Sequence, residues 1–118
     1  MYTKGKELVA QALSTIEGAT VAASYNLAMK QFPSILYAEV VNIPINKGKE
    51  ARTQLAYSID IYSEKSTTEL ACAVDNALTR IGLKRGQCMD LDDPSGLRHK
   101  NMKYTGVYDT NTQLIYHA

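Results

Sequence analysis

The stretch QLAYSIDIY, from Gln54 to Tyr62, alternates large apolar side chains with smaller or polar ones. A period of two is typical of a β-strand that turns one face to a core and the other partly to water. The apolar face holds Leu55, Tyr57, Ile59 and Ile61, and the other face holds Gln54, Ser58 and Asp60. The stretch therefore predicts an amphipathic strand that needs a second layer to pack against.

A helix is expected shortly after this strand. Ser66-Thr67-Thr68-Glu69 has the S-x-x-E form of a capping box, in which the serine and glutamate satisfy free amides at a helix start. Apolar residues then recur at helical spacing from Leu70 to Ile81, and Gly82 can take the left-handed conformation that ends a helix. We expect one core shared by this helix and the strand, formed by Val74, Leu78, Tyr57, Ile59 and Ile61.

The N-terminal part predicts one more helix and one more strand. Apolar residues on one helical face indicate a helix over 4–17, with Gly18 as its C-terminal cap. Residues 19–34 are expected to be mostly connection, with a short helical turn possible at 25–31. A strand over 35–43 is expected to end at Pro44; Glu39 interrupts its alternating pattern, in which one side carries Ile35, Tyr37, Val41 and Ile43.

The C-terminal part reads as strands joined by short turns. After a basic turn at 84–86, strands are expected at 87–91, 100–108 and 112–117, the last two forming a hairpin. Strands joined by short turns pair antiparallel, and two amphipathic helices can cover one face of the sheet. We therefore predict one α+β domain over residues 1–118: a two-layer sandwich with a mainly antiparallel sheet of four to five strands and two helices on one face.

Charge and composition narrow the functional classes. The 118-residue chain has a formal net charge of +1, so no overall field attracts it to nucleic acid or to an anionic membrane. No apolar run reaches the length of a membrane-spanning helix and the N-terminus has no secretory signal, which predicts a soluble intracellular protein. Cys72 and Cys88 are expected to be two buried thiols, although a disulfide between them stays open.

The segment from Asp90 to His99, DLDDPSGLRH, is the densest group of chemically active side chains. Its aspartates lack the alternating spacing and the later glutamate of a calcium loop, and Pro94 with Gly96 indicates a turn. His99 and His117 have no nucleophile in a recognisable motif, so both are expected to be exposed. We predict a solvated loop, no catalytic residue, no metal and no cofactor, and thus a protein that is not an enzyme.

Two other functions remain as alternatives. A small metal-dependent enzyme would use the loop from Asp90 to His99. A small nucleic-acid or ligand-binding module would use a basic and aromatic patch made of Lys84, Arg85, Lys100, Lys103 and Tyr104. The more ordinary reading of that patch is strand chemistry, in which tyrosines fill a pleated surface and lysines protect an edge.

The order of elements resembles the small tail-completion and tail-terminator proteins of tailed bacteriophages and prophages, which join tail to head. The resemblance covers roughly Phe32 to Tyr116. It is carried first by an N-terminal helix and by Phe32-Pro33-Ser34-Ile35, which leads into a strand with Glu39. The run from Leu55 to Ser63 then leads into a helix that ends Ile81-Gly82-Leu83. Tyr104-Thr105-Gly106 precedes a final hairpin.

The resemblance implies a structural virion protein, assembled in the bacterial host cytoplasm and located in the virion tail. Such proteins form rings, commonly hexamers, that cap the head-proximal end of the tail tube and contact the tail-tube protein and a head-connector or stopper protein. DNA could pass through the ring, with no membrane and no specific nucleic-acid partner. A ring needs two complementary patches on each subunit; the candidate interface residues are Lys47, Lys49, Glu50, Arg52, Asp90, Asp92, Asp93 and Arg98.

Overall fold

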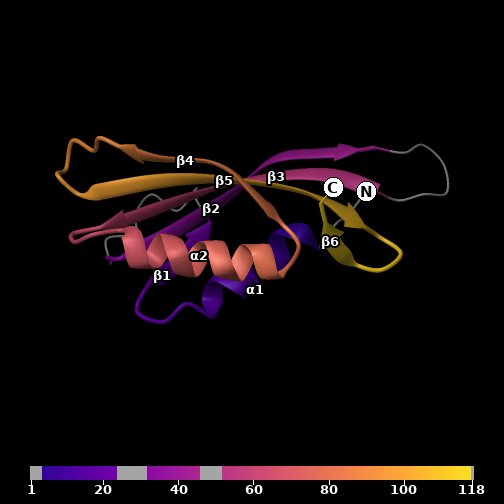
Figure 1. Cartoon of the computed structure of the whole chain (residues 1–118), viewed down its shortest axis with the longest axis horizontal. Helices are drawn as coiled ribbons and strands as arrows, with labels where there is room; N and C mark the ends of the chain where they lie inside the picture. Colours follow the sequence, from indigo (N-terminus) through magenta and orange to yellow (C-terminus); the bar gives the residue numbers. More distant parts are fainter. Residues whose placement is uncertain (1–3, 24–31, 46–51, 118) are drawn as a thin grey trace.

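The chain folds into a six-stranded, mostly antiparallel sheet with both helices on one face (Figure 1). A computed structural model describes residues 4–23, 32–45 and 52–117. The α+β class, the antiparallel sheet and the two helices on one face are confirmed; the sheet has six strands instead of four to five. The elements are α1 (Gly5–Ser14), β1 (Thr20–Ala23), β2 (Ser34–Pro44), β3 (Arg52–Ser63), α2 (Thr68–Arg80), β4 (Lys84–Leu91), β5 (Arg98–Asp109) and β6 (Leu114–Tyr116).

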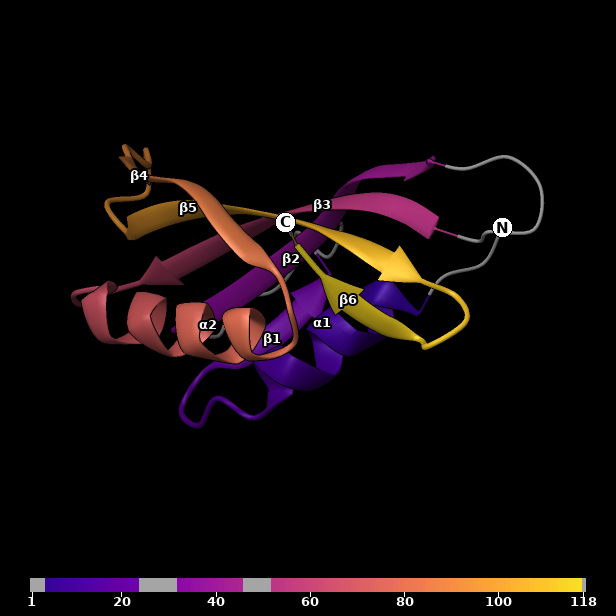
Figure 2. The same cartoon turned by 45° about the vertical axis from the view of Figure 1, so that its right-hand side comes forward.

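Strand β5 organises one half of the sheet. The strands lie in the order β1-β2-β3-β5-β4, and β6 also pairs with β5. Since β3 pairs with β5 along its whole length, β4 and β6 lie end to end on the other side of β5, with β4 opposite residues 99–105 and β6 opposite residues 107–109. Figure 2 shows this arrangement, with α1 and α2 beneath the sheet. The opposite face carries no helix among the described residues and is called the helix-free face below.

The core lies between the sheet and the helices. All five residues expected to share it are fully buried: Tyr57, Ile59, Ile61, Val74 and Leu78. Residues of α1 and of the last strands complete it, among them Val9, Leu13, Leu83, Met102 and Tyr108. The alternating pattern of β3 was sufficient to predict this core because every second residue of the strand faces α1 and α2.

Strand β1 is the element that the sequence pattern missed. Residues 19–34 were expected to be mostly connection, but Thr20–Ala23 pairs in parallel with the start of β2, where Thr20 lies opposite Ser34. Four residues are too few to show a period of two, and two of them are alanines. The helical turn considered at 25–31 lies outside the described residues.

A bulge in β2 changes which residues of that strand face the core. The register with β3 shifts between Glu39 and Val41. Before the bulge, Ile35 and Tyr37 lie opposite core residues of β3; after it, Val41 and Ile43 lie opposite Ala56 and Gln54, on the helix-free face. The prediction that these four residues share one side was therefore wrong, because the inserted residue inverts the alternation.

The ends of the helices differ in detail from the predictions. Helix α1 ends at Ser14, three residues before the predicted end. Helix α2 begins at Thr68, and the capping box does not form: the Ser66 hydroxyl accepts from the backbone N–H of Thr68 at 3.3 Å, and the residue that precedes the helix makes no side-chain cap. Gly82 follows α2 with φ of 104°, as expected for a left-handed C-terminal residue.

Both cysteines differ from their predicted burial. Cys72 and Cys88 are free thiols, and both are exposed instead of buried. Cys72 lies on the outer side of α2. Cys88 belongs to the edge strand β4, which begins at Lys84 and so includes the predicted basic turn; all eight residues of this strand are exposed. A short strand at the sheet edge lacks the neighbours that would bury a side chain.

Candidate interaction surfaces

The segment from Asp90 to His99 forms the hairpin between β4 and β5. Asp90 lies in β4 and forms an ion pair with Lys100 of β5, at 3.0 Å between Oδ1 and Nζ. The carboxylate of Asp93 accepts hydrogen bonds from the Ser95 hydroxyl at 2.7 Å and from its backbone N–H at 2.9 Å. These two bonds hold the pKa of Asp93 below its usual value. Asp90 and Asp93 therefore have separate partners.

The hairpin has the geometry of a turn, as predicted. The Gly96 N–H donates to the Asp93 carbonyl oxygen at 3.0 Å, and Gly96 has φ of 82°. Among the described residues, no three His, Cys, Asp or Glu side chains are grouped so that they could hold a metal ion. The arrangement is that of a charged surface turn.

The candidate interface residues lie at opposite ends of the molecule. Arg52 begins β3 and lies opposite Asp109, whereas Arg98 lies opposite Ser63 at the other end of the same ladder. Eleven residues of extended chain separate the two ends, about 36 Å. Asp90 and the hairpin belong to the Arg98 end (Figure 1). Lys47, Lys49 and Glu50 lie outside the described residues. The structure thus brings Asp90, Asp92, Asp93 and Arg98 together and separates them from Arg52.

A polar network on the helix-free face was not predicted. The Nδ2 atom of Asn101 donates to Ser58 Oγ and to Asp60 Oδ1, both at 2.9 Å. His99 Nε2 lies 2.7 Å from the same Asp60 oxygen. The Lys103 ammonium donates to Ser58 Oγ at 3.1 Å. Each of these side chains has a hydrogen-bond partner within the network.

The prediction that His99 is exposed was wrong. Its side chain is only 13% exposed, and its ring stacks on Tyr62 with the ring centroids 4.1 Å apart. The sequence contained a partial signal, since Ser58 and Asp60 alternate on the outer face of their strand. Finding their partners also required the register of β3 with β5, which no local pattern supplies. His117 is exposed, as expected.

The basic and aromatic patch of the nucleic-acid alternative is divided by the fold. Tyr104 is fully buried, and its hydroxyl donates to Asp75 of α2 at 2.8 Å. Lys100 pairs with Asp90 and Lys103 with Ser58, from opposite faces of β5. Tyr104 is therefore not available for stacking on a base, and the expected role of tyrosine as filling of the pleated surface holds for this residue.

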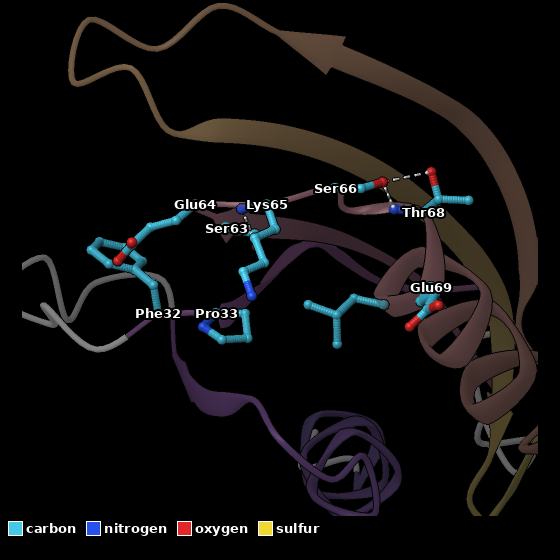
Figure 3. Close-up of a pocket in the computed structure, with 9 residues that line it drawn as sticks. Phe32, Pro33, Ser63, Glu64, Lys65, Ser66, Thr68 and Glu69 are labelled. Atoms are coloured by element: carbon cyan, nitrogen blue, oxygen red, sulfur yellow. Dashed lines mark hydrogen bonds between the residues drawn. The ribbon is translucent and has the colours of Figure 1, made fainter.

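An open pocket lies where the start of β2 meets the start of α2 (Figure 3). Its volume is about 800 Å³, and Phe32, Pro33 and Leu70 supply apolar wall. Charged residues also line it, namely Glu64, Lys65 and Glu69. In Figure 3 the Lys65 side chain extends toward Pro33. Opposite charges on an open apolar pocket do not single out one class of ligand.

Comparison with models of known protein families found no match, and comparison with curated proteins found none. Neither helix of the described part of the chain combines the length and apolar content needed to cross a bilayer. The resemblance to phage tail proteins therefore rests on the order of elements and on the residues quoted for it.

Proposed function

We propose that this chain is a structural protein of a phage or prophage tail, which assembles as a ring of six subunits at the head-proximal end of the tail tube and helps to join tail to head. The observation that carries the proposal is that the described candidate interface residues lie at opposite ends of the β3–β5 ladder. One end begins at Arg52, and the other ends in the hairpin with Asp90, Asp92 and Asp93.

A ring requires a head-to-tail contact between two different patches of the same subunit. Patches at opposite ends of an elongated molecule are suited to this, because each subunit can reach both neighbours. The molecule measures 49 Å along its longest axis and 24 and 22 Å across. The hairpin carboxylates of one subunit would contact the end of the next subunit that carries Arg52 and, in the sequence, Lys47 and Lys49.

The charges would mainly set orientation, while apolar and tyrosine contacts supply most of the affinity. The partners in this proposal are a second copy of the chain, the tail-tube protein and a head-connector or stopper protein. No cofactor is needed for such a role.

The test is a double charge reversal, Asp92→Lys with Asp93→Lys. Because both carboxylates lie on a surface turn, the variant is expected to fold, with a small loss of stability from the two Ser95 hydrogen bonds of Asp93. It should lose ring formation on tail-tube ends, measured by mass in solution, and fail to complement particles that lack the protein. Adding Lys47→Glu and Lys49→Glu should recover part of the loss. A double reversal that assembles and complements like the parent would show that the hairpin is a plain solvated turn.

A further inference from the structure

Exposed apolar side chains collect on the helix-free face of the sheet. The described residues include eight large exposed apolar side chains, and the strand registers put five of them on this face: Ile43, Met89, Leu91, Leu114 and Tyr116. Leu114 is 64% exposed and Ile43 is 56% exposed. Exposed apolar residues gathered on one face, with polar residues between them, are typical of a protein interface.

We propose that this face binds a second copy of the chain, stacked face to face with its strands reversed, to form a two-fold dimer. The positions along β5 suggest this symmetry. Leu114 and Leu91 lie opposite Asp109 and His99, and Tyr116 and Met89 lie opposite Val107 and Asn101. Both pairs are centred on Tyr104. A two-fold axis that crosses β5 at this residue therefore sets Leu114 on Leu91 of the second copy, and Tyr116 on its Met89.

The same axis gives complementary neighbours on the other strands. On β5, Asp109 falls opposite His99 of the second copy, and Thr105 opposite its Lys103. On β3, Gln54 lies opposite Asp60 of the second copy, and Arg52 lies on Tyr62 of the second copy. The second contact suits the attraction between a guanidinium and an aromatic ring. No two like charges meet directly in these rows. Each contact occurs twice, because the interface is its own complement.

The size of the face also fits a stable dimer. A 12-residue strand such as β5 is about 40 Å long, and four adjacent strand positions span about 19 Å. The area of this sheet face is therefore roughly 760 Å². A standard interface buries about 800 Å² per partner. The polar network of Asp60, His99 and Asn101 already satisfies its own hydrogen bonds, so that covering it leaves few unpaired groups.

This inference does not depend on the proposed role in a tail. Asp92 and Asp93 follow β4 and lie outside the stacked rows, so the hairpin stays at the rim of the dimer, where it can contact other copies. The dimer is the form expected for the purified chain before any ring is built.

The first test is mass in solution by light scattering and sedimentation. The parent should be a dimer at about 100 μM. Leu114→Lys should weaken dimerisation by at least about tenfold with an unchanged circular dichroism spectrum, since a charge then meets Leu91 of the partner. Asn76→Lys adds the same charge on the helix side and should remain dimeric, as should the Asp92→Lys, Asp93→Lys variant. A monomeric parent, or a Leu114→Lys variant as dimeric as the parent, overturns the proposal.

The second test fixes the orientation by cross-linking. Both native cysteines are first replaced by serine, and single-cysteine variants Leu114→Cys and Leu91→Cys are then treated with a short thiol cross-linker. The two variants should cross-link when mixed and should not cross-link alone. If each variant links to itself and the mixture adds no product, or if no product forms at all, the reversed stack is overturned.

Discussion

Tyr104 of β5 donates its hydroxyl hydrogen bond to Oδ1 of Asp75 in α2, at 2.8 Å, and so ties the helix layer to a central strand. The phenol ring is fully buried, while the carboxylate lies at the boundary with solvent. Burial, followed by the hydrogen bond to Asp75, raises the pKa of Tyr104 above its usual value.

Removing this bond should destabilise the fold without changing it. We expect Tyr104→Phe to lower the free energy of unfolding by about 1 to 2 kcal/mol, because the carboxylate loses its donor while the ring still packs. Chemical denaturation measures the change. Tyr37→Phe, on a tyrosine whose hydroxyl has no hydrogen-bond partner among the described residues, is the matched control and should stay within about 0.5 kcal/mol of the parent. Equal effects of the two substitutions would contradict a structural role for the Asp75 bond.

Two buried tyrosines should make the protein sensitive to alkali. Burial, and then a hydrogen bond to Glu39, also raises the pKa of Tyr57. In the unfolded chain a tyrosine ionises near pH 10. Because the folded state holds these protons more tightly, their contribution to stability is complete below about pH 10 and decreases as the pH rises further. Melting temperature measured against pH should show this decrease, with a shallower slope for Tyr104→Phe.

The core between α2 and the sheet should not accept a charge. Val74 is fully buried, and Val74→Asp is expected to unfold the domain, since the carboxylate would have no partner there. Circular dichroism and thermal melting provide the measurement. Asn76→Asp introduces the same charge on the exposed side of the same helix and should leave the melt nearly unchanged. A Val74→Asp variant that melts like the parent would remove this residue from the core.

Two glycines with positive φ should differ in their tolerance of a side chain. At Gly82, φ is 104° and a Cβ atom would meet the carbonyl oxygen of Ile115. At Gly96, φ is 82° and nothing lies within 4 Å of the added atom. We expect Gly96→Ala to cost about 1 kcal/mol from backbone conformation alone, and Gly82→Ala to cost clearly more, because β6 must also shift. Similar melting temperatures for the two variants would contradict the close approach of β6.

The sequence was a good guide wherever a local period sets the structure. The alternation in β3 and the helical spacing from Leu70 to Ile81 predicted the core and the fold class, because burial on one face imposes both patterns. It was a poor guide where distant strands meet. The short strand β1 depends on the start of β2 to form, and the exposure of Cys88 follows from its place at a sheet edge.

The same limit applies to the candidate surfaces. The turn at Pro94 and Gly96 could be predicted, since its residues determine it locally. The partners of Asp60 could not, because His99 and Asn101 belong to a strand almost forty residues further along the chain. The ring contact between the basic and acidic segments stays a prediction, and Lys47, Lys49 and Glu50 lie outside the described residues.

The bulge between Glu39 and Val41 divides β2 into two halves that evolve under different constraints. In the first half, Ile35 and Tyr37 face the core, where a change of volume alters stability. In the second half, Ile43 faces outward, and Asn42 lies on the helix side. Val40 is the extra residue of the bulge, so loss of its single codon would remove the bulge and leave Asn42 opposite Leu55 and Ile43 opposite Gln54. One short deletion could thus reduce the local bend of the strand while the residues on both sides of it keep their partners and their faces.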